Sequence, residues 1–195
     1  MKGQLTVGQY RAIDLSLFAF MLAASETVIV WAATRWFPGQ PYTVSVVAAL
    51  TAIVMMRWGL WAILHAVLGG AIYCLVSHGT AQQMLIYCVG NLLGLAAILW
   101  IRLTGAEKLR KDPWRTLAYG ATVLALMQLG RALISVLLGA PLAAAAGFFT
   151  TDALSYLFTL LILWIVRRLD GVFEDQMHYL RRVEKEREEE KGGFR

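Results

Sequence analysis

Five polar side chains stand in or at the edge of long apolar stretches of this sequence. They are Glu26, Asn91, Gln128, Arg131 and Asp152. A charged group at membrane depth is unfavourable unless it is paired or hydrated, so these residues predict a polar site. A guanidinium, two carboxylates and two amides supply donors and acceptors for a small polar ligand, or for one another. Such groups bind a ligand or one another through hydrogen bonds and charge pairs.

Catalytic motifs do not occur in the sequence. It has no HExxH zinc motif, no GxSxG nucleophile turn and no glycine-rich phosphate loop, and no acidic cluster suits a metal. An intramembrane enzyme using Glu26, His65 or His78 lacks a nucleophile–base pair. We therefore expect no enzyme, metal or cofactor. Cys74 and Cys88 form no metal motif, and they either pack in the core or bridge two spans.

Composition places these residues in a membrane. The chain has 195 residues, 58% of them hydrophobic, whereas soluble domains hold about 45–50%. The first apolar block follows a polar stretch without a cleavage site, so we expect it to be retained as a span. The sequence predicts an all-α membrane protein with six transmembrane helices, at residues 13–34, 42–56, 60–76, 82–101, 116–138 and 152–166. Segments 42–56 and 60–76 are short and form a tight hairpin, and whether they cross fully is left open.

The charge distribution predicts the orientation. The net charge is +5, yet residues 167–195 hold eight basic and eight acidic residues, so the excess lies at membrane boundaries. Six spans put both termini, the Arg57 turn and the basic loop 102–115 on one side, and only Arg35 on the other. The positive-inside rule then places both termini in the cytoplasm, with the chain multi-pass in the inner (plasma) membrane. The same pattern does not indicate nucleic-acid binding.

With this topology the polar residues share one depth. At 1.5 Å per residue, Glu26 lies about thirteen and Arg131 about fifteen residues from the inner face, and Asn91 about nine from the outer face. Gln128 is one turn below Arg131, and Asp152 is expected to cap the sixth span. We expect a ligand site in the outer half between spans one, four, five and six. The alternative is a buried Glu26–Arg131 ion pair that only fixes the packing.

Three further segments carry expectations. Asp14 suits the N-terminus of the first helix, because a carboxylate is favourable there. Residues 139–147 read as a Gly/Ala-rich connection. The chain divides into a transmembrane domain, 1–168, and a charged cytoplasmic tail, 169–195, whose apolar residues recur at helical spacing up to residue 191. That tail is either a solvated helix continuing the sixth span or a helix that docks a partner or dimerises.

The layout up to about residue 168 resembles the substrate-binding S components of energy-coupling factor (ECF) transporters, which are small six-span bacterial proteins. In that family an Ala-xxx-Ala face of the first helix contacts a membrane scaffold (T) subunit, and two ATPase subunits complete the transporter. Here Ala19 and Ala23 match that face. The resemblance implies a membrane-embedded capture subunit for a vitamin-like micronutrient, working beside those partners in the lipid bilayer.

The resemblance also implies where the ligand lies. The family binds it in the outer half, mainly with helices four to six, which is where Asn91, Gln128, Arg131 and Asp152 fall. Arg131 beside two amides suits a carboxylate or a polar heterocycle, and Glu26 suits an amine or ring N–H. A similar layout occurs in rod-shape scaffold membrane proteins, and the charged tail is unusual for S components. The alternative function is therefore a non-catalytic scaffold that acts through its tail.

Overall fold

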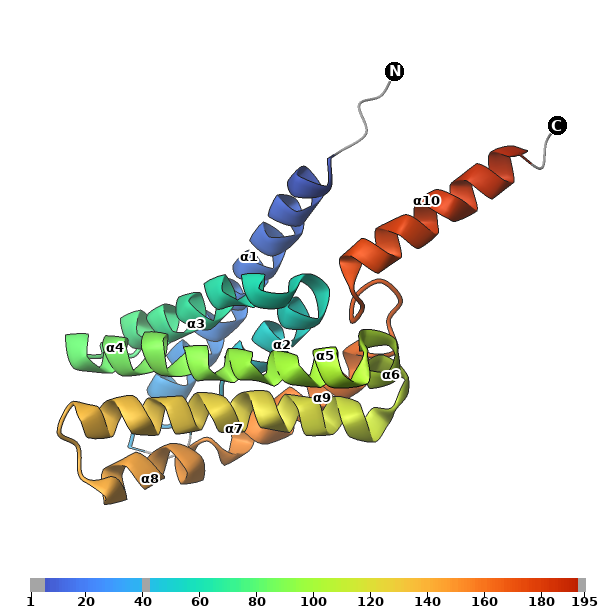
Figure 1. Ribbon diagram of the computed structural model, residues 1–195. Helices are drawn as coiled ribbons and strands as arrows, with labels where there is room; N and C mark the ends of the chain where they lie inside the picture. The colour runs from blue at the N-terminus through green and yellow to red at the C-terminus, as the bar shows by residue number, and fades with distance from the viewer. Residues whose placement is uncertain (1–5, 40–42, 193–195) are drawn as a thin grey trace.

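The computed structural model describes residues 6–39 and 43–192, and within them every regular element is a helix (Figure 1). Among these residues five helical stretches are long and apolar enough, by length and composition, to cross a membrane, namely Val7–Trp36, Val47–Val76, Ala81–Thr104, Pro113–Leu137 and Leu142–Val166. The chain is therefore a helical membrane protein, as its composition predicts.

Helix α1 (Val7–Trp36) starts earlier than the sequence predicts. Thr6 and Gln9 form a reciprocal capping box, in which each side chain accepts a hydrogen bond from the other residue's backbone N–H. Asp14 consequently lies about two turns inside the helix, so its predicted place at the N-terminus is wrong. One face of α1 packs inward with Asp14 and Glu26, while Phe20 on another face is exposed.

The second long apolar stretch folds back on itself. Helix α2 (Val47–Trp58) leads through a 3₁₀ turn, η1 (Gly59–Ala62), into α3 (Ile63–Val76). Gly59 has a φ of 62°, which glycine adopts without strain. Val47 lies against Gly69 across the hairpin, which confirms the predicted tight turn. The predicted start of this span, Tyr42, lies outside the described residues.

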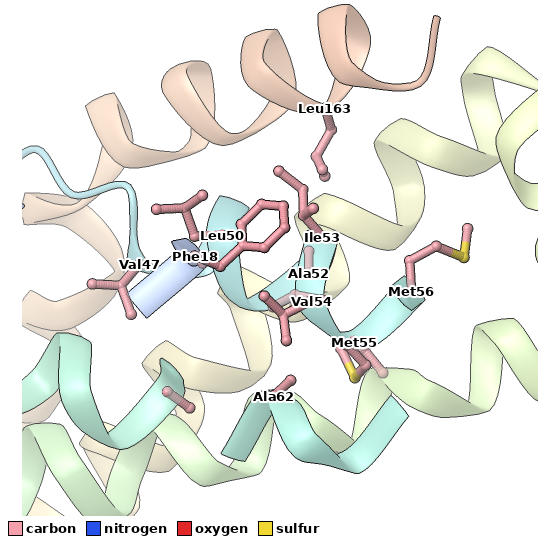
Figure 2. Close-up of a cluster of buried hydrophobic side chains, with 14 of the residues drawn as sticks. Phe18, Val47, Leu50, Ala52, Ile53, Val54, Met55, Met56, Ala62 and Leu163 are labelled. Carbon is pink, nitrogen blue, oxygen red and sulfur yellow. The ribbon is translucent and has the colours of Figure 1, made fainter. Parts of the chain in front are cut away.

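Helix α2 is too short to cross the hydrocarbon core by itself, since its 12 residues extend about 18 Å against about 30 Å. All of its residues are buried. Figure 2 shows its side chains pointing outward in several directions, toward Phe18 of α1, Ala62 of η1 and Leu163 further along the chain. Because neighbouring helices surround it, α2 is the centre of the bundle.

The next segment runs through α4 (Ala81–Gly90), the 3₁₀ segment η2 (Asn91–Ala97) and α5 (Ile98–Thr104). A short helix, α6 (Ala106–Lys111), occupies the basic loop. Helix α7 (Pro113–Leu137) follows, with Asp112 accepting hydrogen bonds at its N-terminus and Pro113 at the first helical position. In Figure 1 this helix lies alongside α4, η2 and α5 over nearly its whole length.

Residues 139–147 are not a simple connection. Helix α8 (Leu142–Thr151) begins within them and continues into α9 (Ala153–Val166) with a break at Asp152. Asp152 is the N-cap residue of α9, at the predicted position, but its side chain makes no capping hydrogen bond. Its carboxylate instead turns toward other helices.

The tail helix does not continue the sixth span. After α9 the chain turns, with Gly171 at a φ of 72°, and α10 (Gln176–Gly192) starts in a new direction and extends away from the bundle (Figure 1). Between them Phe173 is fully buried and lies near the ring of Tyr119 of α7. The segment before α10 therefore packs as part of the bundle.

The helices run alternately between two ends of the bundle. Figure 1 shows the start of α1, the turn between α2 and α3, α6 and α10 at one end, and the α3–α4 and α7–α8 turns at the other. The basic residues of the loop around α6 gather at the first end. Arg35, in the last turn of α1, lies at the second end.

Candidate functional site

Arg131 is the centre of a buried polar cluster. Its Nε donates a hydrogen bond to Oδ1 of Asn91 at 2.8 Å, and its Nη1 donates to Oδ2 of Asp152 at 2.7 Å. The guanidinium also lies over the ring of Tyr87, 4.7 Å from its centroid. Only 4% of Arg131 is exposed. The buried arginine is therefore paired with Asp152. The alternative, a Glu26–Arg131 ion pair, is not formed.

The carboxylate of Asp152 accepts hydrogen bonds from α7, from α9 and from the segment before α2. Besides Arg131, its carboxylate accepts hydrogen bonds from the hydroxyls of Thr43 and Ser155. The Asn91 amide also donates to the backbone oxygen of Ala66 in α3, at 3.0 Å. The cluster therefore joins α3, η2, α7 and α9 with the non-helical segment before α2.

Glu26 approaches the same region from α1. Its Oε2 accepts a hydrogen bond from the backbone N–H of Val46, at 3.0 Å. Its Oε1 has no partner among the described residues, although Glu26 is fully buried. In the same segment the Ser45 N–H donates to the hydroxyl of Ser155. These bonds keep residues 43–46 out of the helix, which is why α2 begins at Val47 and not at the predicted Tyr42.

Gln128 is the one predicted ligand residue that the structure does not bring to this cluster. It is buried and accepts a hydrogen bond from the Tyr156 hydroxyl at 2.9 Å. It lines neither of the cavities described below. Its place one turn from Arg131 turns it toward α9 and away from Asn91.

Glycines allow the helices that carry the cluster to touch. A Cβ on Gly90 would lie 2.6 Å from the backbone nitrogen of Arg131, and one on Gly130 would collide with the backbone of Gly90. A Cβ on Gly70 would lie 2.7 Å from the carbonyl carbon of Tyr87. Small residues permit this backbone approach in membrane bundles. They bring Asn91 and Tyr87 within reach of Arg131.

Two adjacent cavities lie at the cluster. The inner one has a volume of ≈ 10 Å³, room for about one water-sized group, and Glu26, Asn91, Arg131 and Asp152 are in its lining. The outer one is larger, ≈ 720 Å³, and lies among the ends of α1, α3 and α9. Its lining is formed by Val30, Ala33, Thr34, Phe37, Pro38, Gly39, Thr43, Val44, Tyr73, Ser77 and Leu154.

The shared lining residues relate the two cavities to each other. Thr43 and Tyr73 line both, so the two cavities meet at these residues. Most residues around the inner cavity carry polar side chains, whereas the outer cavity is mainly apolar with a few hydroxyls. A mainly apolar cavity of several hundred Å³ with a few convergent polar groups is the ordinary form of a small-molecule site.

A second buried ion pair, which sequence reasoning missed, lies at the other end of the bundle. Arg57 donates to both carboxylate oxygens of Asp14, at 2.8 and 2.6 Å, and the Trp58 indole donates to the same carboxylate. Arg57 also donates to the backbone oxygens of Gly171 and Val172. The sequence could have indicated this pair, because Asp14 and Arg57 were expected at the same end of neighbouring spans.

Three other predicted features have plain roles. His65 is buried and makes a hydrogen bond with the backbone oxygen of Leu15, so it is a packing residue. Cys74 and Cys88 are free thiols, so no bridge joins them; Cys74 is buried, as core packing predicts, whereas Cys88 is only half-buried. Ala19 and Ala23 are half-buried beside the inward face of α1.

Comparison of the chain with protein-family models, with curated proteins and with solved structures finds no match.

Proposed function

We propose that this protein is the substrate-capture subunit of a micronutrient uptake transporter, similar to an ECF S component. The observation that carries the proposal is the outer cavity of ≈ 720 Å³, which lies against the buried polar cluster. In this proposal the chain crosses the plasma membrane six times with both termini in the cytoplasm. The cavity then opens outward, where nutrients are met.

The architecture supports capture more than transport by this chain acting alone. The cluster at Arg131 is held by at least four segments, and α2 is enclosed on all sides. A bundle locked in this way suits a rigid binding site that relies on partners for movement. The half-buried face at Ala19 and Ala23 is our proposed contact with a membrane scaffold subunit, which works with ATPase subunits.

The test is native mass spectrometry of the protein purified in mild detergent, with released small molecules identified. We expect one small molecule per chain in the wild type. Ala33 lines the outer cavity, so Ala33→Trp fills it and should abolish that molecule. Val28→Trp is the matched control, because Val28 lies on the same helix and is exposed on its outward face.

The outcomes separate clearly. Loss of the bound molecule in Ala33→Trp but not in Val28→Trp supports capture. An empty wild-type protein, or a molecule that remains bound equally in both variants, overturns it.

A scaffold is the second candidate, and the geometry of the tail favours it. Arg110 pairs with Glu174 at 2.6 Å and Arg182 of α10 pairs with the same carboxylate at 3.0 Å, so the base of α10 is fixed. A helix extending from a fixed base suits contact with another protein. Under this candidate the empty wild type would co-purify a membrane protein, and removal of α10 would release it.

A further inference from the structure

Glu26 holds a carboxylate oxygen that nothing in the described fold uses. Oε2 is taken by the Val46 N–H, whereas Oε1 is buried without a partner among the described residues and the side chain lines the inner cavity. A buried carboxyl oxygen without a donor is unfavourable, because the hydration it loses on folding is not replaced. A ligand that donates to Oε1 would remove this penalty on binding.

The charged residues around the inner cavity also favour a cationic ligand, because acidic groups outnumber basic ones in the described lining. Glu26 and Asp152 are both in its lining, and Arg131 is the cation that the described lining supplies. Arg131 is already paired with Asp152. A ligand carboxylate would therefore place a third acidic group beside a cation that is already paired. A ligand cation would compensate Glu26 without breaking any existing pair.

Size and surroundings decide what kind of cation fits. The inner cavity holds about one water-sized group, which matches a primary ammonium group. Tyr73 lies where the two cavities meet, and aromatic rings attract cations. Above it, Val30 and Ala33 of α1 and Leu154 of α9 supply apolar walls for a hydrophobic body. One face of α1 thus carries Glu26 at the floor and Val30 one turn higher.

We infer that the captured substrate is a small organic cation, with an ammonium group donating to Oε1 of Glu26 and an apolar body filling the outer cavity. This rests on the proposed function and names its substrate class. Arg131 and Asp152 then form the structural floor of the site, and Glu26 is the residue that selects the charge.

Three probes of similar shape and different charge test the inference. They are phenethylamine, phenethyl alcohol and 3-phenylpropionate, each titrated while the thermal midpoint of the full-length protein in detergent is followed. Sodium chloride supplies an inorganic cation for comparison. We expect phenethylamine to raise the midpoint most and 3-phenylpropionate least. Glu26→Gln keeps the shape and an acceptor for the Val46 N–H, and should weaken phenethylamine binding about 10- to 100-fold, the loss of a charge-assisted hydrogen bond.

Thr159→Val is the matched control, because its hydroxyl is also buried without a partner in the described chain but lies outside both cavities. Its amine response should equal that of the wild type. Equal responses to all three probes, no response to phenethylamine, or stabilisation by sodium alone overturn the inference. If a co-purified molecule is nevertheless lost in Ala33→Trp, the capture function stands and only the substrate class falls. If phenethylamine does not bind and no co-purified molecule is lost in Ala33→Trp, both the substrate class and the capture function are wrong.

Discussion

At the scale of single residues, the Arg131–Asp152 pair holds the cluster together, and this changes how the site is probed. Removing one partner leaves a buried uncompensated charge, which costs about 3–5 kcal/mol. We expect Arg131→Met to lower the free energy of unfolding by about that amount. Combining it with Asp152→Asn should cost less than the sum of the two single variants, because the new amide oxygen can still accept from Thr43 and Ser155.

A double-mutant cycle measured by unfolding in SDS titrations checks this. Additive losses would mean that the two side chains do not interact. The same reasoning shows why Arg131→Ala is a poor test of ligand binding, since it destabilises the fold whether or not a ligand exists. Cavity filling at Ala33 leaves the ion pair intact.

The residue types of the site were predictable from the sequence, whereas their pairing was not. An arginine and two carboxylates inside apolar segments indicate a buried polar cluster wherever they fall. Which carboxylate meets Arg131 depends on the rotation of each helix about its axis. The break between α8 and α9 turns Asp152 inward, and residues 43–46 take up Glu26 through Val46. Neither feature has a sequence signal.

At the scale of elements, the contact of α4 with α7 positions Asn91 beside Arg131. We expect Gly90→Ala to lower the free energy of unfolding by about 1–3 kcal/mol or more, because the new methyl meets backbone that cannot rotate away. Gly147→Ala is the control, since nothing lies within 4 Å of the added carbon. It should be neutral or stabilising by about 0.5–1 kcal/mol. Equal effects in SDS unfolding would contradict the close approach.

The tail has two parts that truncation separates. A chain ending at Gln176 keeps Phe173 in the core and the backbone oxygens that Arg57 uses. We expect its thermal midpoint to stay close to that of the full chain. A chain ending at Leu169 loses both and should be less stable by about 3–5 kcal/mol, the cost of removing a buried phenylalanine. Equal stability of the two truncated chains would show that segment 170–176 does not hold the bundle.

Most helix ends that the sequence missed have a local cause. The capping box at Thr6 lengthens α1, and the chain turns at Gly171, so that α9 does not continue into the tail helix. The helical periodicity of the tail was real, but Phe173 belongs to the core and not to the stripe of α10. Periodicity identifies an apolar face and cannot say which partner covers it.

At the scale of the whole molecule, the alternating directions of the helices separate two ends of different character. One end carries the basic loop, the Asp14–Arg57 pair and the tail. The other carries Arg35 and the outer cavity. The positive-inside rule therefore predicts that the cavity opens away from the cytoplasm.

Cysteine labelling in intact cells tests this orientation. The background would be Cys74→Ala with Cys88→Ala, which removes both native thiols. Arg35→Cys and Lys108→Cys are exposed positions at opposite ends of the bundle. We expect a membrane-impermeant maleimide to label Arg35→Cys in intact cells, and Lys108→Cys only after permeabilisation.

The reverse pattern would place the cavity in the cytoplasm, and nutrient capture from outside would then fail even if a ligand were found. Labelling of both positions in intact cells would mean that they lie on one side, and six crossings would be wrong. Because the 12 residues of α2 reach only about 18 Å, six crossings require that residues 43–46 and the surrounding helices complete its path.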